Sequence, residues 1–136
     1  MKVEIRKITA ADTLKIRYEV LWPDKSPDFV KVAEDDDAHH FGLFSDHQLV
    51  SVISLFPDKD GMRFRKFATI RAFQNKGLGS KLLEFVIVYS RNQKYTRLWC
   101  DARSSAMAFY KRFGFERISE PFFKEDIEYY KIEKVL

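Results

Sequence analysis

The chain has 136 residues, of which 46% are hydrophobic and 15% aromatic. That length suits one compact domain over residues 1–136 and is short for two. Thirteen Phe against five Gly and four Pro is a core-forming composition, which argues against disorder and against a coiled coil. The net charge is +4, a small excess whose position along the chain matters more than its size.

The cysteine content and the first residues of the chain argue against several further classes of protein. The single cysteine, Cys100, cannot form an intramolecular disulfide or a thiolate metal cluster, so we expect no metal. The first twelve residues contain no long apolar run of the kind found in signal peptides. The longest apolar stretches, such as residues 85–89, are far too short to span a membrane. We therefore expect a soluble, cytoplasmic protein.

The N-terminal third predicts a strand, a helix and an irregular segment. Val3 and Ile5 alternate with charged residues, the period of a strand with one buried face. Asp12 is a suitable N-cap for a helix over residues 13–21, which Trp22 and Pro23 would end. Residues 23–37 contain two prolines and an acidic run and predict no long element.

Three strands in succession are expected next. Residues 38–44 and 49–56 are rich in strand-forming residues, and the four residues between them predict a hairpin. A second turn, over residues 58–61, leads into a strand at 62–70, so the three strands should pair antiparallel.

The second half alternates helices and strands. Apolar residues at intervals of four, four and three predict a helix from about residue 78 to 91 with its core face on Leu78, Leu82, Val86 and Tyr89. A short strand at 96–100 and a short helix at 106–113 follow, and Gly114 is a suitable stop for that helix. Strands at 115–118 and 127–135 close the chain, joined through residues 120–121 and a turn near 125–126.

This order of elements predicts a mixed α/β (α+β) fold. The strand at 62–70, the helix at 77–91 and the strand at 96–100 form a crossover unit, which requires a parallel strand pair. The remaining connections are hairpin-like, so the sheet should be mostly antiparallel and flanked by helices.

The positive charge is concentrated in one segment. Residues 61–81 contain six basic residues and no acidic one, whereas the rest of the chain has 18 basic and 20 acidic residues, a net charge of −2. The excess therefore lies on one strand, one loop and the start of one helix, which indicates an anionic ligand at that loop.

The loop itself has the chemistry for a phosphate. Residues 74–79 read Gln-Asn-Lys-Gly-Leu-Gly between a predicted strand and a predicted helix. Glycines allow backbone N–H groups to approach a ligand closely, and a helix N-terminus offers unpaired N–H donors. The segment matches neither a Walker A loop nor a three-glycine dinucleotide fingerprint. A plain strand-to-helix turn is the alternative.

Two spaced motifs together carry a resemblance. The first is Gln74-x-x-Gly77-x-Gly79 after a strand, and the second, about thirty residues later, is Arg103-x-x-Ala106-x-x-Phe109-Tyr110-x-x-x-Gly114-Phe115. They resemble the pyrophosphate loop and the following helix of the GNAT superfamily of acyl-coenzyme A dependent N-acetyltransferases. The order of elements resembles that family over nearly the whole chain, and the closing 121–132 segment is similar to the last hairpin of small bacterial members.

The resemblance implies a site and a cofactor. The parallel strands would be splayed at the sheet centre, and Phe67, Ala68 and Thr69 would hold the pantetheine arm of acetyl-CoA. The backbone of Gln74, Asn75, Lys76, Gly77, Leu78, Gly79 and Ser80 would bind the pyrophosphate, with Arg71, Lys76 or Lys81 as further phosphate contacts. Tyr110 matches the tyrosine that protonates the departing thiolate in many members, although a core aromatic is the alternative interpretation.

Departures from the family pattern leave the general base open. Residues 62–70 contain no Asp or Glu, where many members place a base, and Arg103 stands where an Asn is common. That arginine could contact a phosphate or an anionic substrate. Candidate bases are Glu34, Asp35, Asp36, Asp37, His39, His40 and Asp101, although an acidic run is most often a solvated loop. Cys100 reads as a small buried strand residue rather than a nucleophile.

The leading hypothesis is an enzyme that transfers acetyl from acetyl-CoA to a primary amine of a small molecule or peptide by direct attack in a ternary complex. An amine needs deprotonation before it attacks, and the thiolate needs a proton as it leaves. A non-catalytic acyl-CoA sensor is the alternative. Nucleic-acid binding is disfavoured because the net charge is small and no stacking platform is evident. No membrane partner is expected, and a homodimer is compatible with the family resemblance.

Overall fold

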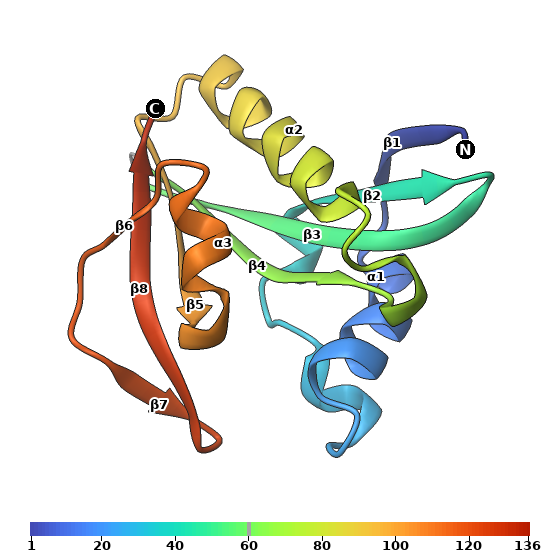
Figure 1. Cartoon of the computed structure of the whole chain (residues 1–136), viewed down its shortest axis with the longest axis horizontal. Helices are drawn as coiled ribbons and strands as arrows, with labels where there is room; N and C mark the ends of the chain where they lie inside the picture. The colour runs from blue at the N-terminus through green and yellow to red at the C-terminus, as the bar shows by residue number, and fades with distance from the viewer. Residues whose placement is uncertain (60) are drawn as a thin grey trace. The chain divides into compact units, whose positions relative to one another are not determined.

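A computed structural model describes residues 1–59 and 61–136. Its described strands are β1 (Val3–Ile8), β2 (His39–Ser45), β3 (Gln48–Asp58), β4 (Gly61–Thr69), β5 (Arg97–Arg103), β6 (Glu116–Arg117), β7 (Phe122–Lys124) and β8 (Ile127–Val135). They form an eight-stranded sheet in the order β1-β2-β3-β4-β5-β8-β6, with β7 also paired to β8. The pair β4 with β5 is parallel, and the pairs β1 with β2, β2 with β3, β5 with β8, β6 with β8 and β7 with β8 are antiparallel. The predicted fold class, a mixed α/β fold with a mostly antiparallel sheet and one parallel pair, is therefore confirmed (Figure 1).

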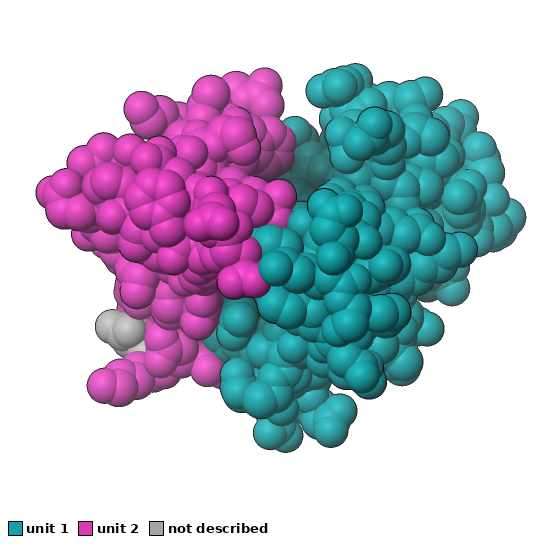
Figure 2. All heavy atoms as spheres, turned by 90° about the horizontal axis from the view of Figure 1, so that it is seen from below, with its two compact units in different colours: residues 1–56, 64–86 teal, residues 57–63, 87–136 magenta. Residues whose placement is uncertain are grey.

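The chain divides into two compact units, residues 1–56 with 64–86 and residues 57–63 with 87–136 (Figure 2). Each is described by itself below. Whether the chain acts as a single functional domain stays a prediction.

The first unit contains the N-terminal strands and helix. Its strands are β1 (Val3–Ile8), β2 (His39–Ser45), most of β3 (Gln48–Asp58) and most of β4 (Gly61–Thr69). Its helices are α1 (Ala10–Ile16), which continues as a π-helical turn (Arg17–Leu21), and the first part of α2 (Leu78–Asn92). Short 3-10 turns lie at Pro27–Val30, Asp35–Asp37 and Arg71–Phe73.

The start of α1 corrects the sequence-based prediction. Thr9, not Asp12, is the N-cap, and Asp12 is the third helical residue of a capping box. The Thr9 hydroxyl accepts from the Asp12 N–H at 3.2 Å, while the Asp12 carboxylate accepts from the Thr9 N–H at 3.1 Å. Reciprocal capping satisfies two helix-end donors at once, so the helix begins three residues before the predicted start. It ends as α-helix at Ile16, where the π-helical turn takes over.

The hairpin between β2 and β3 follows from its turn residues. Asp46 and His47 have φ angles of 48° and 73°, the left-handed pair of a type I′ turn, whose twist matches that of the strands. A core cluster of Ile16, Val52 and Ala68 lies behind these strands, with Ile8, Val20, Leu21, Leu49 and Ile70 packed against it. The second predicted turn, between β3 and β4, includes Asp60, which lies outside the described residues.

The second unit contains the C-terminal strands. Its elements are the start of β4, the end of α2, β5 (Arg97–Arg103), a 3-10 turn (Ser104–Ala106), α3 (Met107–Lys111), β6 (Glu116–Arg117), β7 (Phe122–Lys124) and β8 (Ile127–Val135). Gly61, Met62 and Arg63 of β4 pair in parallel with Arg97, Leu98 and Trp99 of β5.

Three features of this unit differ from the sequence-based prediction. The strand expected to end at Cys100 continues to Arg103, so Asp101 lies within β5 rather than at its end. The α-helix expected over 106–113 covers only Met107–Lys111, because its first turn is 3-10. The three-residue strand β7 was not predicted; it pairs with β8 across a turn in which Glu125 and Asp126 have positive φ.

Gly114 ends α3 as predicted. Its φ angle is 87°, its N–H donates to the Lys111 carbonyl at 3.0 Å, and the Phe115 N–H donates to the Tyr110 carbonyl at 3.3 Å. These two bonds are those of a Schellman motif, in which the left-handed residue favours glycine. The motif turns the chain at Gly114, just after the helix that contains Tyr110.

Candidate functional site

The predicted phosphate loop is exposed and has an unusual backbone. It follows a 3-10 turn over Arg71–Phe73 and runs from Gln74 to Gly77, all exposed to solvent. Asn75 has φ 61° and Gly77 has φ 78°. Two left-handed residues within three positions curl the backbone tightly, and successive N–H groups in such a turn can form a concave anion site.

The loop leads directly into the N-terminus of α2. The Lys81 N–H donates to the Gly77 carbonyl at 3.1 Å, so Gly77 supplies the first helical acceptor. The N–H groups of Leu78, Gly79 and Ser80 therefore have no acceptor within the helix. Glycine has no side chain that could cap them, and the helix dipole adds partial positive charge. This end of α2 is suited to a phosphate group.

The strand β4 packs closely against the helix start. A Cβ added at Gly79 would lie 3.4 Å from Thr69 Oγ1 and 3.5 Å from Phe67 Cζ. The Gln74 side chain reaches back and donates its Nε2–H to the Thr69 carbonyl at 2.9 Å. The structure thus brings Gln74, Gly79, Phe67 and Thr69 together in one unit, and their part in binding a cofactor stays a prediction.

Basic side chains surround this loop. Arg71, Lys76 and Lys81 are all exposed, and the Lys76 ammonium lies 5.9 Å from the centre of the Phe73 ring. No acidic residue occurs between residues 61 and 81. Arg71, Lys76 and Lys81 form no ion pair among the described residues, so the loop carries a local positive charge that would attract a polyanion.

Strand β4 is irregular next to the predicted pantetheine residues. Lys66 has φ 57° in the middle of the strand, a conformation that non-glycine residues seldom adopt. It directly precedes Phe67 and Ala68, of which Ala68 is buried and Phe67 half-buried. Local irregularities of this kind change the direction in which strand side chains point.

Tyr110 lies in the second unit and is buried among aromatic rings. Its ring centre is 5.2 Å from that of Phe109 and 5.7 Å from that of Phe115, with steep angles between the planes. Burial, with a smaller contribution from Cys100, raises the pKa of Tyr110 well above its ordinary value. The phenol therefore keeps its proton throughout the physiological range and can serve as a hydrogen-bond donor or proton donor.

Cys100 is a buried strand residue, as predicted. It is 3% exposed, and burial, reinforced by Asp101, raises the pKa of its thiol well above the ordinary value. A thiol held neutral in this way is a poor nucleophile.

Asp101 belongs to an ionic cluster. Its Oδ2 accepts from Arg63 Nη2 at 2.9 Å and from Lys124 Nζ at 2.8 Å. The Arg63 guanidinium in turn lies 4.7 Å from the centre of the Trp99 ring. Both cations are bound to the same carboxylate oxygen, so Asp101 is engaged in contacts within the protein. Arg103 is half-buried at the end of the same strand.

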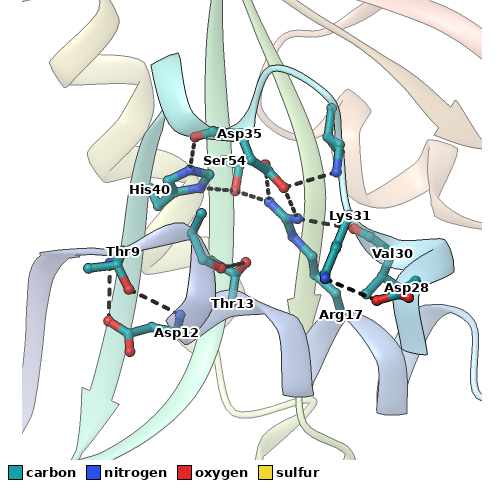
Figure 3. Close-up of polar contacts among 12 residues, drawn as sticks. Thr9, Asp12, Thr13, Arg17, Asp28, Val30, Lys31, Asp35, His40 and Ser54 are labelled. Carbon is teal, nitrogen blue, oxygen red and sulfur yellow. Dashed lines mark hydrogen bonds and ion pairs between the residues drawn. The ribbon is translucent and has the colours of Figure 1, made fainter.

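A buried ion pair holds the acidic segment in the first unit. Arg17, which is 0% exposed, binds both carboxylate oxygens of Asp35 at 2.8 and 2.9 Å (Figure 3). Burial acts to raise the pKa of Asp35, but the hydrogen bonds from Arg17 and from the Val32 N–H outweigh it, and the pKa is lowered. Asp35 is therefore an ionised anchor for the segment rather than an available base.

His40 belongs to the same hydrogen-bond network. Its Nε2 lies 2.8 Å from the Asp35 carbonyl oxygen and its Nδ1 lies 2.6 Å from Ser54 Oγ, which also accepts from Arg17 Nη2 at 2.9 Å (Figure 3). A carbonyl accepts only, so Nε2 carries a proton in this arrangement. Both ring nitrogens are thus engaged within the protein, an arrangement typical of a structural histidine.

The other candidate bases are more accessible. Glu34, Asp36 and Asp37 are exposed, and His39 is half-buried. Partial burial, with the charges of Lys7 and His40, lowers the pKa of His39 and leaves its imidazole neutral at neutral pH. The choice of base among Glu34, Asp37, His40 and Asp101 stays a prediction; of these four, Glu34 and Asp37 have exposed carboxylates.

Arg17 was not singled out from the sequence, although a signal for it exists. Thr13, Ile16 and Val20 mark one helical face, and Arg17 lies on that face at the i, i+3, i+4, i+7 spacing. A charged residue inside an apolar stripe indicates a buried partner. Its pairing with Asp35 rather than with a neighbouring acid depends on the fold of the intervening chain.

No helix within the described residues is both long enough and apolar enough to cross a membrane.

Comparisons with known proteins agree with this arrangement. A family model described as an acetyltransferase (GNAT) domain matches residues 24–136. A curated relative, the uncharacterized N-acetyltransferase YitI of Bacillus subtilis (strain 168), is 28% identical over 129 residues, covering 88% of this chain and 87% of the relative.

Solved structures show the same fold. A Lactobacillus plantarum protein, provisionally named an N-acetyltransferase, superimposes with a TM-score of 0.89 at 20% identity, covering 100% of this chain and 99% of that one. A GNAT family acetyltransferase from Elizabethkingia anophelis, solved with acetyl-CoA bound, gives a TM-score of 0.75 at 20% identity, covering 98% of each chain. With the family model matched over most of its length, the chain belongs to the GNAT family of acetyltransferases.

Proposed function

We propose that this protein transfers an acetyl group from acetyl-CoA to a primary amine of a small molecule or peptide, by direct attack in a ternary complex. The observation that carries the proposal is the loop before α2, in which Asn75 and Gly77 are left-handed and a glycine precedes three helix N–H groups. This backbone and the basic side chains around it are suited to the pyrophosphate of coenzyme A.

The proposed chemistry has three parts. The neutral amine attacks the thioester carbonyl and forms a C–N bond, the C–S bond breaks, the nitrogen loses one proton to become the amide, and the departing thiolate takes one proton. We assign that last step to Tyr110, because it stands at the tyrosine position of the family motif and its phenol is protonated at neutral pH. A free amine has a pKa near 10.4, so it must lose a proton before it attacks. We assign this step to an exposed carboxylate, Glu34 or Asp37.

The cofactor contacts follow the family motif. The strand residues Phe67, Ala68 and Thr69 would bind the pantetheine arm, and the backbone from Gln74 to Ser80 the pyrophosphate. Arg71, Lys76 and Lys81 are exposed and would meet the remaining phosphate charge. We place Arg103 as a further contact to a phosphate or to an anionic substrate.

Binding of acetyl-CoA is tested by thermal unfolding. At a concentration about a hundredfold above the Kd, acetyl-CoA should stabilise the wild type by about 2.7 kcal/mol and raise its Tm. Gly79→Glu should abolish this shift, because the new side chain would crowd Thr69 and Phe67 and place a carboxylate beside the pyrophosphate.

The matched control is Gln93→Glu, which adds the same charge at an exposed position after α2. It should keep the full shift in Tm. A Gly79→Glu protein that folds and is still stabilised by acetyl-CoA as much as the wild type would refute the loop as the binding site.

A specific observation also supports a second function, that of an acyl-CoA sensor. Strand β4 contains no carboxylate, and the Asp101 and His40 candidates are engaged in ion pairs or hydrogen bonds. An acyl-CoA sensor without turnover needs no base. Release of free thiol from acetyl-CoA in the presence of amines separates the two functions.

A further inference from the structure

A buried serine on β3 is bonded to the strand end that contacts the loop. Ser51 is 0% exposed. Its hydroxyl donates to the Ala68 carbonyl at 3.2 Å and lies 2.8 Å from Thr69 Oγ1. Both partners are among the β4 residues assigned to the pantetheine arm, but Ser51 itself belongs to neither motif of the sequence.

The proton balance fixes the direction of the second bond. A serine hydroxyl has one proton, and Ser51 uses it for the Ala68 carbonyl. The Thr69 hydroxyl must therefore donate to Ser51 Oγ across the 2.8 Å contact. With its proton directed at β3, Thr69 presents only acceptor lone pairs to its other neighbours.

Those neighbours are the loop and the start of α2. Thr69 Oγ1 lies 3.4 Å from the Cβ position of Gly79, and the Thr69 carbonyl accepts from Gln74 Nε2 at 2.9 Å. The Ile70 N–H, one residue on, donates to the Val50 carbonyl at 2.9 Å, so the backbone here is also tied to β3. Thr69 is thus bonded to β3 through its side chain and to the loop through its carbonyl.

We propose that Ser51 is a positioning residue for coenzyme A binding: it fixes the rotamer and proton of Thr69 and, through Thr69, the place of Gln74 and Gly79. This inference rests on the proposed function. Ser51 does not itself touch the cofactor. It stabilises the bound form of the loop before the ligand arrives, so its loss should weaken binding and leave the chemical step unaffected.

The test compares Ser51→Ala with Ser90→Ala in the full chain. Ser90 is also 0% exposed, but its hydroxyl has no hydrogen-bond partner among the described residues. Ser51→Ala should weaken the Kd for acetyl-CoA, measured by calorimetry, about fivefold, the size of one typical hydrogen bond. The KM for acetyl-CoA should rise by a similar factor with kcat changed less than about twofold, and Ser90→Ala should leave both unchanged.

A double-mutant cycle with Thr69→Val separates positioning from general loosening. If Ser51 acts through Thr69, Ser51→Ala should change the Kd for acetyl-CoA much less in the Thr69→Val background than in the wild type. The same fivefold loss in both backgrounds would overturn the inference. Should Ser51→Ala not fold, Thr69→Val alone must weaken binding at least as much, and unchanged binding in that variant would overturn it too.

The outcomes distinguish this inference from the function on which it rests. Wild type that binds acetyl-CoA, with Ser51→Ala binding equally well, contradicts only the role of Ser51. Wild type that does not bind acetyl-CoA contradicts the proposed function and the inference together.

Discussion

Tyr110 combines burial with a polar group that can donate a proton. Its hydroxyl belongs to a side chain only 8% exposed and packed between Phe109 and Phe115. Burial raises its pKa, so the phenol stays neutral while a departing thiolate gathers charge. The hydroxyl distinguishes Tyr110 from Phe113, an aromatic residue just after α3 that has no proton to donate.

Replacing Tyr110 by Phe should reduce turnover and spare binding. The ring and its contacts with Phe109 and Phe115 are retained, and only the hydroxyl is lost. General acid catalysis typically contributes about 10²–10⁴-fold, so kcat should fall by at least about 10²-fold. Calorimetry with acetyl-CoA should give a Kd within about threefold of the wild type. A variant as active as the wild type would remove Tyr110 from the mechanism.

Polar residues in the interior were the hardest to assign from the sequence. The acidic run 34–37 looked like a solvated loop, and three of its members are indeed exposed. Asp35 instead pairs with Arg17, eighteen positions earlier. Local patterns do not reveal such a pairing, because it depends on where the 3-10 turns between the two residues direct the chain.

The elements around the candidate site depend on how each helix begins and ends. The residue before α2, Gly77, has no side chain that could cap the helix, whereas α1 begins at a full capping box. A helix start that lacks a side-chain cap has donors left for a ligand. This contrast supports the loop before α2, rather than the start of α1, as the anion site.

Gly114→Ala should destabilise the protein through the end of α3. A left-handed conformation costs a non-glycine residue about 1–2 kcal/mol, and Gly114 has φ 87°. Chemical denaturation should show a loss of free energy of unfolding in that range.

The control separates backbone strain from a local clash. A Cβ at Gly114 would lie 2.8 Å from Lys134 Nζ, the mobile end of a long side chain. In a Lys134→Ala background, Gly114→Ala should therefore cause the same loss. If the loss disappears in that background, the contact with Lys134, not the backbone, explains it.

Element boundaries were predicted well where a turn residue or a strict period marked them. The β2–β3 hairpin, the parallel pair and the stop at Gly114 all follow from such signals. The start of α1 was misplaced because Thr9 and Asp12 are both good N-caps, and only the reciprocal bond decides between them. Strand β7 was missed because its three residues form a strand only by pairing with β8.

At the scale of the whole molecule, the net charge of +4 is the sum of an uneven distribution of charged residues along the chain. One segment of twenty-one residues holds six basic residues and no acidic one. Three of the six, Arg71, Lys76 and Lys81, are exposed at the loop and the start of α2, whereas Arg63 on β4 pairs with Asp101. The remaining residues have a net charge of −2, which is compatible with a cationic amine as acceptor. The fold and the loop could both be predicted from the sequence, but the base could not, because several carboxylates share the same local chemistry.

The most direct test of the central claim is amine-dependent release of coenzyme A. The purified chain is incubated with acetyl-CoA and a broad panel of primary amines, and free thiol is measured together with the N-acetyl product. We predict that at least one amine produces thiol well above the hydrolysis rate, in equal amount to an acetylated amine. If the protein binds acetyl-CoA but releases no thiol above that rate with any amine, it is an acyl-CoA sensor and the proposed transferase activity is wrong.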